Sequence, residues 1–186
     1  MQWLRGGLLL CFLATTALPA DPESSHLLIR SAQVEVDDDV YELDTQLELR
    51  LPAAAREAID GGLTLRLTYE IEVNRVRRYL PDPGVAAIEQ HFELSYHALS
   101  QRYLVRNLNT GEQQDFGTLD AALARVTDVR GLPIIDTSLL PAGSTYEGRV
   151  RAVLDMASAA DAFGWLLFWT DDWSAESDWY TWTLRP

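Results

Sequence analysis

Alternating apolar and polar residues predict two strands near the start of the chain. In residues 41–51 the apolar side chains fall on one side and the charged ones on the other, and the same alternation returns in residues 63–74. A period of two residues is typical of a strand with one buried face. Between the two strands, Pro52, an alanine-rich run and a Gly-Gly pair predict a short connecting helix. The side chains predicted to point inward are Tyr41, Leu43, Thr45, Leu47, Leu49, Leu51, Leu63, Leu65, Leu67, Tyr69, Ile71 and Val73.

Further segments also read as strands, which gives about eight in all. They are residues 28–36, 89–98, 103–108, 145–154 and 177–185, together with the short and ambiguous segment 132–136. Three consecutive aspartates, Asp37 to Asp39, predict a turn after the first of these strands. A calcium loop is the alternative for the aspartates, but the spaced ligands and closing glutamate of an EF-hand are missing.

One segment changes period. In residues 118–128 the apolar side chains recur at helical spacing, and Thr118 precedes them as a suitable N-cap. The chain shows no repeated strand-helix-strand rhythm, so we predict an antiparallel, mainly β fold in which two sheets pack face to face as a sandwich, with one or two short helices. A single curved sheet covered by the helix is the alternative. Meander connectivity is the simplest path for the strands from residue 89 to residue 108.

The first residues predict export. Arg5, an apolar stretch from residue 8 to residue 13 and small residues up to Ala20 have the form of a secretory signal peptide over residues 1–20, cleaved after Ala17 or Ala20. Cys11 lies inside the apolar stretch, so we do not expect a lipid anchor there. We therefore predict a periplasmic chain with a single β-rich domain over residues 21–186 and no transmembrane segment once the signal is removed.

The amino-acid composition argues against two classes of binding partner and against disulfide bonds. The chain has 28 acidic against 15 basic residues and a net charge of −13, which disfavours nucleic acid and anionic membranes as partners. The single cysteine lies in the predicted signal, so the exported domain cannot be held together by disulfides.

The histidines of one predicted strand are candidates for chemistry. His91, Glu93 and His97 point to the same side of it, and imidazole with carboxylate is a common metal ligand set. However, six extended residues span roughly 20 Å, so one ion cannot contact both histidines. No nucleophile elbow is present to pair with either imidazole. We therefore predict no metal, no cofactor and no catalytic residue, and keep His97 as a possible binding residue.

Two other groups are candidate binding surfaces. The densest basic cluster, Arg75, Arg77 and Arg78, ends at Tyr79 and could contact an anion or an acidic peptide. Cross-strand pairing with glutamates such as Glu70, Glu72 and Glu147 is the simpler interpretation. The C-terminal part carries aromatic residues at a spacing of four, which on a helix form one stripe that could stack on a glycan, unless they fill the core. These are Trp165, Trp169 and Trp173.

Several of these motifs resemble the domain-of-unknown-function family 4390, from about residue 29 to the C terminus. The similar segments are Tyr41-x-Leu43-Asp44, Gly62-x-Thr64-Leu65, Arg75-x-Arg77, the run Leu94-Ser95-Tyr96-His97-Ala98-Leu99-Ser100 and the tryptophan-rich ending. The resemblance implies an exported bacterial protein of unassigned activity, often encoded beside a membrane-bound sensor histidine kinase.

These observations together favour a non-enzymatic periplasmic domain that binds another protein. The sensing region of such a kinase is the partner that the resemblance suggests, and an exposed edge strand or the surface from Arg75 to Tyr79 would make the contact. The alternative is a small-ligand or glycan binder that uses the C-terminal tryptophans.

Overall fold

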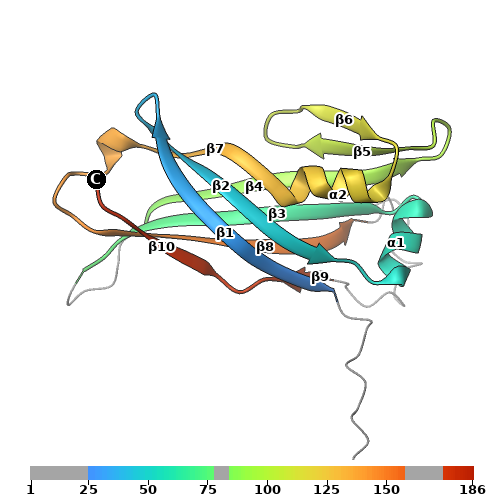
Figure 1. Ribbon diagram of the computed structural model, residues 1–186, viewed down its shortest axis with the longest axis horizontal. Helices are drawn as coiled ribbons and strands as arrows, with labels where there is room; N and C mark the ends of the chain where they lie inside the picture. The colour runs from blue at the N-terminus through green and yellow to red at the C-terminus, as the bar shows by residue number, and fades with distance from the viewer. Residues whose placement is uncertain (1–24, 78–83, 158–173) are drawn as a thin grey trace, which may run out of the picture.

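Two antiparallel sheets face each other across an apolar core, as the computed structural model shows (Figure 1). The structure describes residues 25–77, 84–157 and 174–186. The smaller sheet has three strands in the order β1-β2-β7, namely β1 (His26–Asp37), β2 (Val40–Arg50) and β7 (Asp128–Asp136). The prediction of a mainly β fold with two packed sheets is therefore confirmed.

The larger sheet has seven strands in the order β10-β8-β3-β4-β5-β6, with β9 also paired to β8. Its strands are β3 (Thr64–Arg75), β4 (Gly84–His97), β5 (Arg102–Asn107), β6 (Gln113–Phe116), β8 (Tyr146–Ala157), β9 (Ser174–Glu176) and β10 (Tyr180–Leu184). From β3 to β6 the strands follow one another as a meander, which confirms the path expected for residues 89–108. The late strand β8 then returns to pair with the other side of β3.

Short helices complete the layer opposite the larger sheet. Helix α1 (Ala53–Asp60) carries the chain from β2 to β3, and so from one sheet to the other. Helix α2 (Leu119–Thr127) begins at Thr118, whose hydroxyl accepts a hydrogen bond from the backbone of Ala121 at 3.2 Å. It lies over β4, β5 and β6 beside β7 (Figure 1). A 3-10 turn, η1 (Thr137–Leu139), follows β7. The larger sheet is thus covered partly by the smaller sheet and partly by α2.

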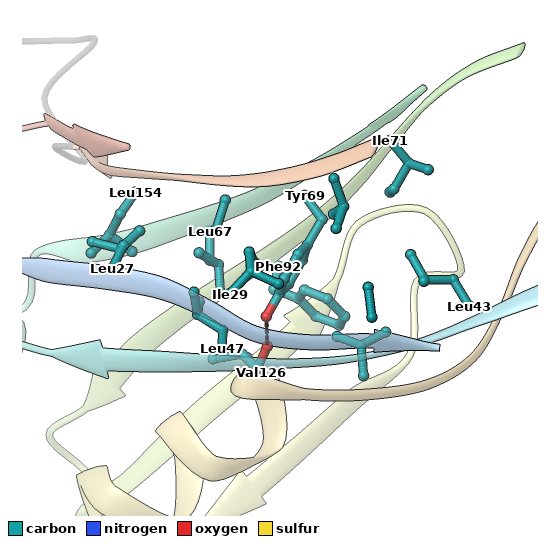
Figure 2. Close-up of a cluster of buried hydrophobic side chains, with 14 of the residues drawn as sticks. Leu27, Ile29, Leu43, Leu47, Leu67, Tyr69, Ile71, Phe92, Val126 and Leu154 are labelled. Atoms are coloured by element: carbon teal, nitrogen blue, oxygen red, sulfur yellow. Dashed lines mark hydrogen bonds between the residues drawn. The ribbon is translucent and has the colours of Figure 1, made fainter. Parts of the chain in front are cut away.

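The core lies where β3 meets the smaller sheet. Figure 2 shows Leu67 of β3 pointing toward Ile29 of β1, and Leu154 of β8 lying opposite Leu27 of β1. The Tyr69 hydroxyl donates a hydrogen bond to the carbonyl of Val126 at 2.8 Å, which ties the larger sheet to the end of α2. Burial of this side chain raises the pKa of Tyr69 well above its ordinary value. The alternation seen in the sequence therefore becomes the contact between two layers.

The run of three aspartates lies at the turn of the hairpin between β1 and β2. Asp38 and Asp39 have φ angles of 42° and 64°, and they form the two-residue turn between the paired residues Asp37 and Val40. A two-residue hairpin turn favours positive φ at both positions, and aspartate tolerates this better than most residues. The prediction of a turn is confirmed.

Some strand boundaries differ from the predictions. Strand β6 was not expected, because Gln113–Phe116 carries mostly polar residues and shows no apolar alternation. Strand β4 begins at Gly84, five residues before the predicted start at residue 89, and ends before Ala98, which is exposed. The predicted final strand, residues 177–185, is shorter in the structure, where β10 spans Tyr180–Leu184, and β9 precedes the predicted segment. Between β9 and β10, Ser177 makes two hydrogen bonds of 2.9 Å to the backbone of Ala152.

The described part of the chain, residues 25–77, 84–157 and 174–186, has no helix that is long and apolar enough to cross a membrane.

Candidate functional site

The outer face of the larger sheet, turned away from the smaller sheet, carries rows of charged residues from β8, β3 and β4. At one end these charges are paired. Glu72 accepts hydrogen bonds from Arg149 at 2.7 and 3.0 Å, and Glu70 accepts one from Arg151 at 2.7 Å. Arg151 also contacts Glu176 of β9 at 2.9 Å. Cross-strand partners of opposite charge therefore satisfy this end of the face.

A tryptophan completes the paired end. The ring centre of Trp179 lies 4.4 Å from the guanidinium carbon of Arg149 and 4.9 Å from that of Arg151. Guanidinium groups stack favourably on aromatic rings because the ring face is electron-rich. Trp179 thus stacks on the two arginines of the Glu–Arg pairs, and its ring helps to hold them against the outer face of the sheet.

The other end of the outer face is hollowed. An open pocket of about 500 Å³ lies there, within the range of volumes typical of small-ligand sites. Its walls come from β3, β4 and β8 and from the turn after β5. The lining residues are Arg66, Thr68, Glu70, Glu89, His91, Leu108, Val153 and Asp155. Three of them are carboxylates and one is a guanidinium, so the lining carries more acidic than basic side chains.

A hydrogen-bonded chain crosses the pocket floor. The hydroxyl of Thr68 lies 3.0 Å from Nδ1 of His91, and Nε2 of His91 lies 3.3 Å from a carboxylate oxygen of Glu89. Hydroxyl, imidazole and carboxylate are also the parts of a hydrolytic triad. Here, however, Thr68 is only 8% exposed and is held in mid-strand. The contacts of Thr68 and Glu89 therefore fix the imidazole of His91 in the pocket wall. They do not present the Thr68 hydroxyl to a substrate as a nucleophile.

Asp155 differs from the other charged residues of this face. Its side chain is half-buried, and burial raises the pKa of Asp155, while the nearby charge of Arg66 and that of His91 act in the opposite direction. Arg66 itself pairs with Glu93 at 2.9 Å. Among the residues that the structure describes, none hydrogen-bonds or ion-pairs with the Asp155 carboxylate. The pocket thus holds a partly desolvated carboxylate to which no described residue donates a hydrogen bond.

Of the predicted arginine cluster the structure describes Arg75 and Arg77, and neither lines the pocket. Arg75 is half-buried at the end of β3, where it donates a hydrogen bond of 2.6 Å to the hydroxyl of Ser144, and Arg77 follows it with an exposed side chain. Glu70 and Glu72, two of the expected partners of this cluster, pair instead with arginines of β8. Arg78 and Tyr79 lie outside the described residues. A binding role for the cluster stays a prediction.

His97, another predicted binding residue, does not line the pocket. His97 is exposed at the end of β4, and its Nδ1 lies 2.8 Å from the hydroxyl of Ser100 in the following turn. Trp165, Trp169 and Trp173 lie outside the described residues. Within residues 25–77, 84–157 and 174–186, no three histidine, cysteine, aspartate or glutamate side chains are grouped so that they could hold a metal ion.

The sequence pointed to only part of the pocket. The sequence marks His91 as a candidate because imidazole is a common metal ligand, whereas Thr68 and Asp155 do not stand out, because each is one polar residue in a regular strand. The available signal was the outward parity of β3 and β8. It places Thr68 and Asp155 on the same face, but the pairing register that makes them neighbours comes from the structure.

The edge of the smaller sheet is a second candidate surface. Strand β1 has 12 residues and pairs along one side with β2. Its face packs on β8, β9 and β10. Along its other side, no described residue makes a ladder with it. An edge of this kind presents free backbone donors and acceptors.

The comparison with protein families gave one match. The sequence model of a family described as "Domain of unknown function (DUF4390)" matches residues 24–183. No curated protein and no solved structure matches the chain.

Proposed function

The chain belongs to the DUF4390 family, and we propose that it is a non-enzymatic periplasmic protein-interaction domain that binds its partner through the open edge of β1. The observation that carries this proposal is the length of that edge. In an antiparallel pair about half of the backbone N–H and C=O groups of an outer strand point away from its neighbour. A partner segment in extended conformation can pair with them as an added strand.

The other sheet edges are less suited to this role. Strands β6 and β10 have 4 and 5 residues, respectively. Strand β7 has 9 residues, but its register shifts twice and it includes Pro133, which has no N–H to donate. Strand β1 has one shift, next to Arg30. Short strands, bulges and prolines usually protect a sheet edge against pairing with another chain. Strand β1 is long, contains no proline and has a single register shift, so it is the least protected of these edges.

Three further points bear on the location and the charge of the proposed partner. The first 20 residues have the form of an export signal. The family resemblance suggests a neighbouring gene for a membrane-bound sensor histidine kinase, so the periplasmic region of such a kinase is the partner that we propose. The net charge of −13 favours a partner surface with basic residues.

Site-specific photo-crosslinking tests the proposal. A photoreactive amino acid is placed at Gln33, which is exposed on β1, and as a matched control at Thr183, which is exposed on β10. The experiment is done in a bacterium that encodes both this protein and the kinase. We expect Gln33 to crosslink to the periplasmic region of the kinase and Thr183 not to do so. Absence of a kinase product from Gln33, or equal products from both positions, would contradict the proposal.

A second variant tests the mode of binding. Val34 is half-buried and points toward the core side of β1. A lysine at this position places a charge on the inner side of an edge, which disfavours the addition of another strand. Val34→Lys is therefore expected to abolish the crosslink from Gln33 while the protein still shows a cooperative thermal transition. A variant that folds and crosslinks as before would argue against strand addition.

A further inference from the structure

The pocket on the outer face of the larger sheet has no role in the proposed function, because β1 belongs to the other sheet. Its most informative residue is Asp155. A carboxylate that is partly removed from water without a hydrogen-bond donor lowers the stability of the fold. Most other carboxylates of this face, such as Glu70, Glu72 and Glu93, have an arginine partner within 3.0 Å. Since no residue within 25–77, 84–157 and 174–186 donates to Asp155, its carboxylate leaves a position that a ligand donor can fill.

The lining of the pocket decides which donor fits. Glu70 is paired with Arg151 and Arg66 is paired with Glu93. Glu89 and Asp155 therefore leave the lining with a negative charge, which would repel an anionic ligand. A metal ion requires several oxygen or nitrogen ligands around one point, and the described residues do not form such a group. A cation that brings its own hydrogen-bond donors needs only one or two acceptors. Alkylammonium and guanidinium groups meet this condition.

The apolar part of the lining supports an organic cation further. Val153 lies between Asp155 and Arg151 on the outer side of β8, and Leu108 lies opposite, where its backbone N–H donates to the carbonyl of His91 at 2.9 Å. Both are side chains on which a hydrocarbon stem can pack while its charged end reaches the carboxylate, as long basic side chains do on protein surfaces.

From this geometry we propose that the outer-face pocket binds an organic cation, whose ammonium or guanidinium group pairs with Asp155 and whose aliphatic stem lies against Val153 and Leu108. The wall formed by Thr68, His91 and Glu89 keeps the imidazole fixed and adds acceptor charge beside the bound cation. A free diamine and the lysine or arginine side chain of a peptide share this chemistry, and the experiment separates them.

Isothermal titration calorimetry of the purified protein at low salt tests the proposal. The cations are agmatine, which has a guanidinium and an ammonium group on one aliphatic chain, and acetylated, amidated Gly-Arg-Gly and Gly-Lys-Gly. Pentanoate serves as the anion of similar stem length, and Mg²⁺ as the inorganic cation. We expect at least one organic cation to bind with a dissociation constant of about 1 mM or tighter, and pentanoate and Mg²⁺ not to compete with it.

Two variants locate the binding. Asp155→Asn keeps the size of the side chain and removes its charge, and we expect affinity to fall about tenfold or more, as for the loss of a charged hydrogen bond. Glu147→Gln removes a carboxylate from the same face at the other end of β8 and is the matched control, with affinity unchanged. Thermal melting of both variants confirms that they are folded.

The titrations distinguish the two sources of the cation, and three results would overturn the proposal. Stronger binding of agmatine assigns the pocket to free amines, and stronger binding of the peptides assigns it to basic side chains; both support the proposal when Asp155→Asn weakens them. Absence of binding by every organic cation would overturn it. So would binding that is equally strong in Asp155→Asn, or displacement of the cation by Mg²⁺. None of these results depends on β1, so the protein-interaction proposal stands or falls separately.

Discussion

The inner and outer faces of the larger sheet are made by the same strands but follow different rules. On the inner face of β3, residues such as Leu65, Leu67 and Ile71 are at most 2% exposed and pack against the smaller sheet. On the outer face, the alternating residues Glu70 and Glu72 are half-buried and pair with arginines of β8. The inner face requires only apolar side chains of suitable size, whereas the outer face requires particular partners.

This difference shows where to look for function on a fold of this kind. Any well-packed set of apolar residues can stabilise the inner face, so its composition carries little information about ligands. On the outer face, complementary pairs satisfy one end, and the carboxylate of Asp155 at the other end has no donor among the described residues. A buried charge without a partner lowers the free energy of unfolding, and charges of this kind are typical of ligand-binding and catalytic sites.

Substitution on the inner face is expected to have the largest effect on stability. Leu154 is completely buried, and Leu154→Ala should lower the free energy of unfolding by about 2–5 kcal/mol. Its neighbour Val153 points to the outer face and is half-buried, so Val153→Ala should cost less than about 1.5 kcal/mol. Urea unfolding of both variants measures the contrast. Equal losses would mean that the two faces of β8 are not distinct.

Substitution at the paired end of the outer face should have a smaller effect. Glu70→Gln removes the carboxylate that pairs with Arg151, where both side chains are 29% exposed. We expect a loss of about 0.2–1 kcal/mol, which decreases at high salt because screening weakens the pair. Urea unfolding at low and high salt measures it, with Glu147→Gln as the exposed control. A loss that is independent of salt would contradict an ionic contribution.

Substitution at Asp155 should have the smallest effect and the opposite sign. The pKa of Asp155 is raised in the folded protein, so ionisation of this group costs stability above that pKa, and the cost disappears below its unfolded value of about 3.9. Asp155→Asn should therefore be slightly more stable than the parent at neutral pH, and the difference should disappear as the pH falls below about 3.9. Arg66, His91 and Glu93 also face this group, and they are unchanged in the comparison.

Unfolding measured in urea at several pH values checks this expectation. A variant that is less stable than the parent at neutral pH would show that the Asp155 carboxylate has a stabilising partner in the folded protein.

The sequence predicted the architecture well because its strands alternate clearly. The inward residues of β3, the helix behind Thr118 and the aspartate turn all follow from local patterns of period, capping and turn preference. Strand β6 and the break at Ser177 could not be predicted in this way, because polar residues form the first and hydrogen bonds to a distant strand cause the second.

The pocket could not be predicted for a related reason. Asp155 faces Arg66 and lies near His91 only because β8 pairs with β3 and β3 pairs with β4 in one particular register. Residues 66, 91 and 155 are far apart in the chain, and no local pattern connects them. The sequence shows which face each residue occupies, whereas long-range pairing decides which charges meet.

The most direct test of the account is an NMR titration of the Asp155 side-chain carboxyl carbon, with and without agmatine. The account predicts that the pKa of Asp155 lies above the ordinary aspartate value of about 3.9 in the free protein, and that it falls when the cation binds, because a paired positive charge stabilises the ionised form. An ordinary pKa that agmatine leaves unchanged would contradict the claim that Asp155, which accepts no hydrogen bond from the described residues, is the carboxylate that pairs with a cationic ligand.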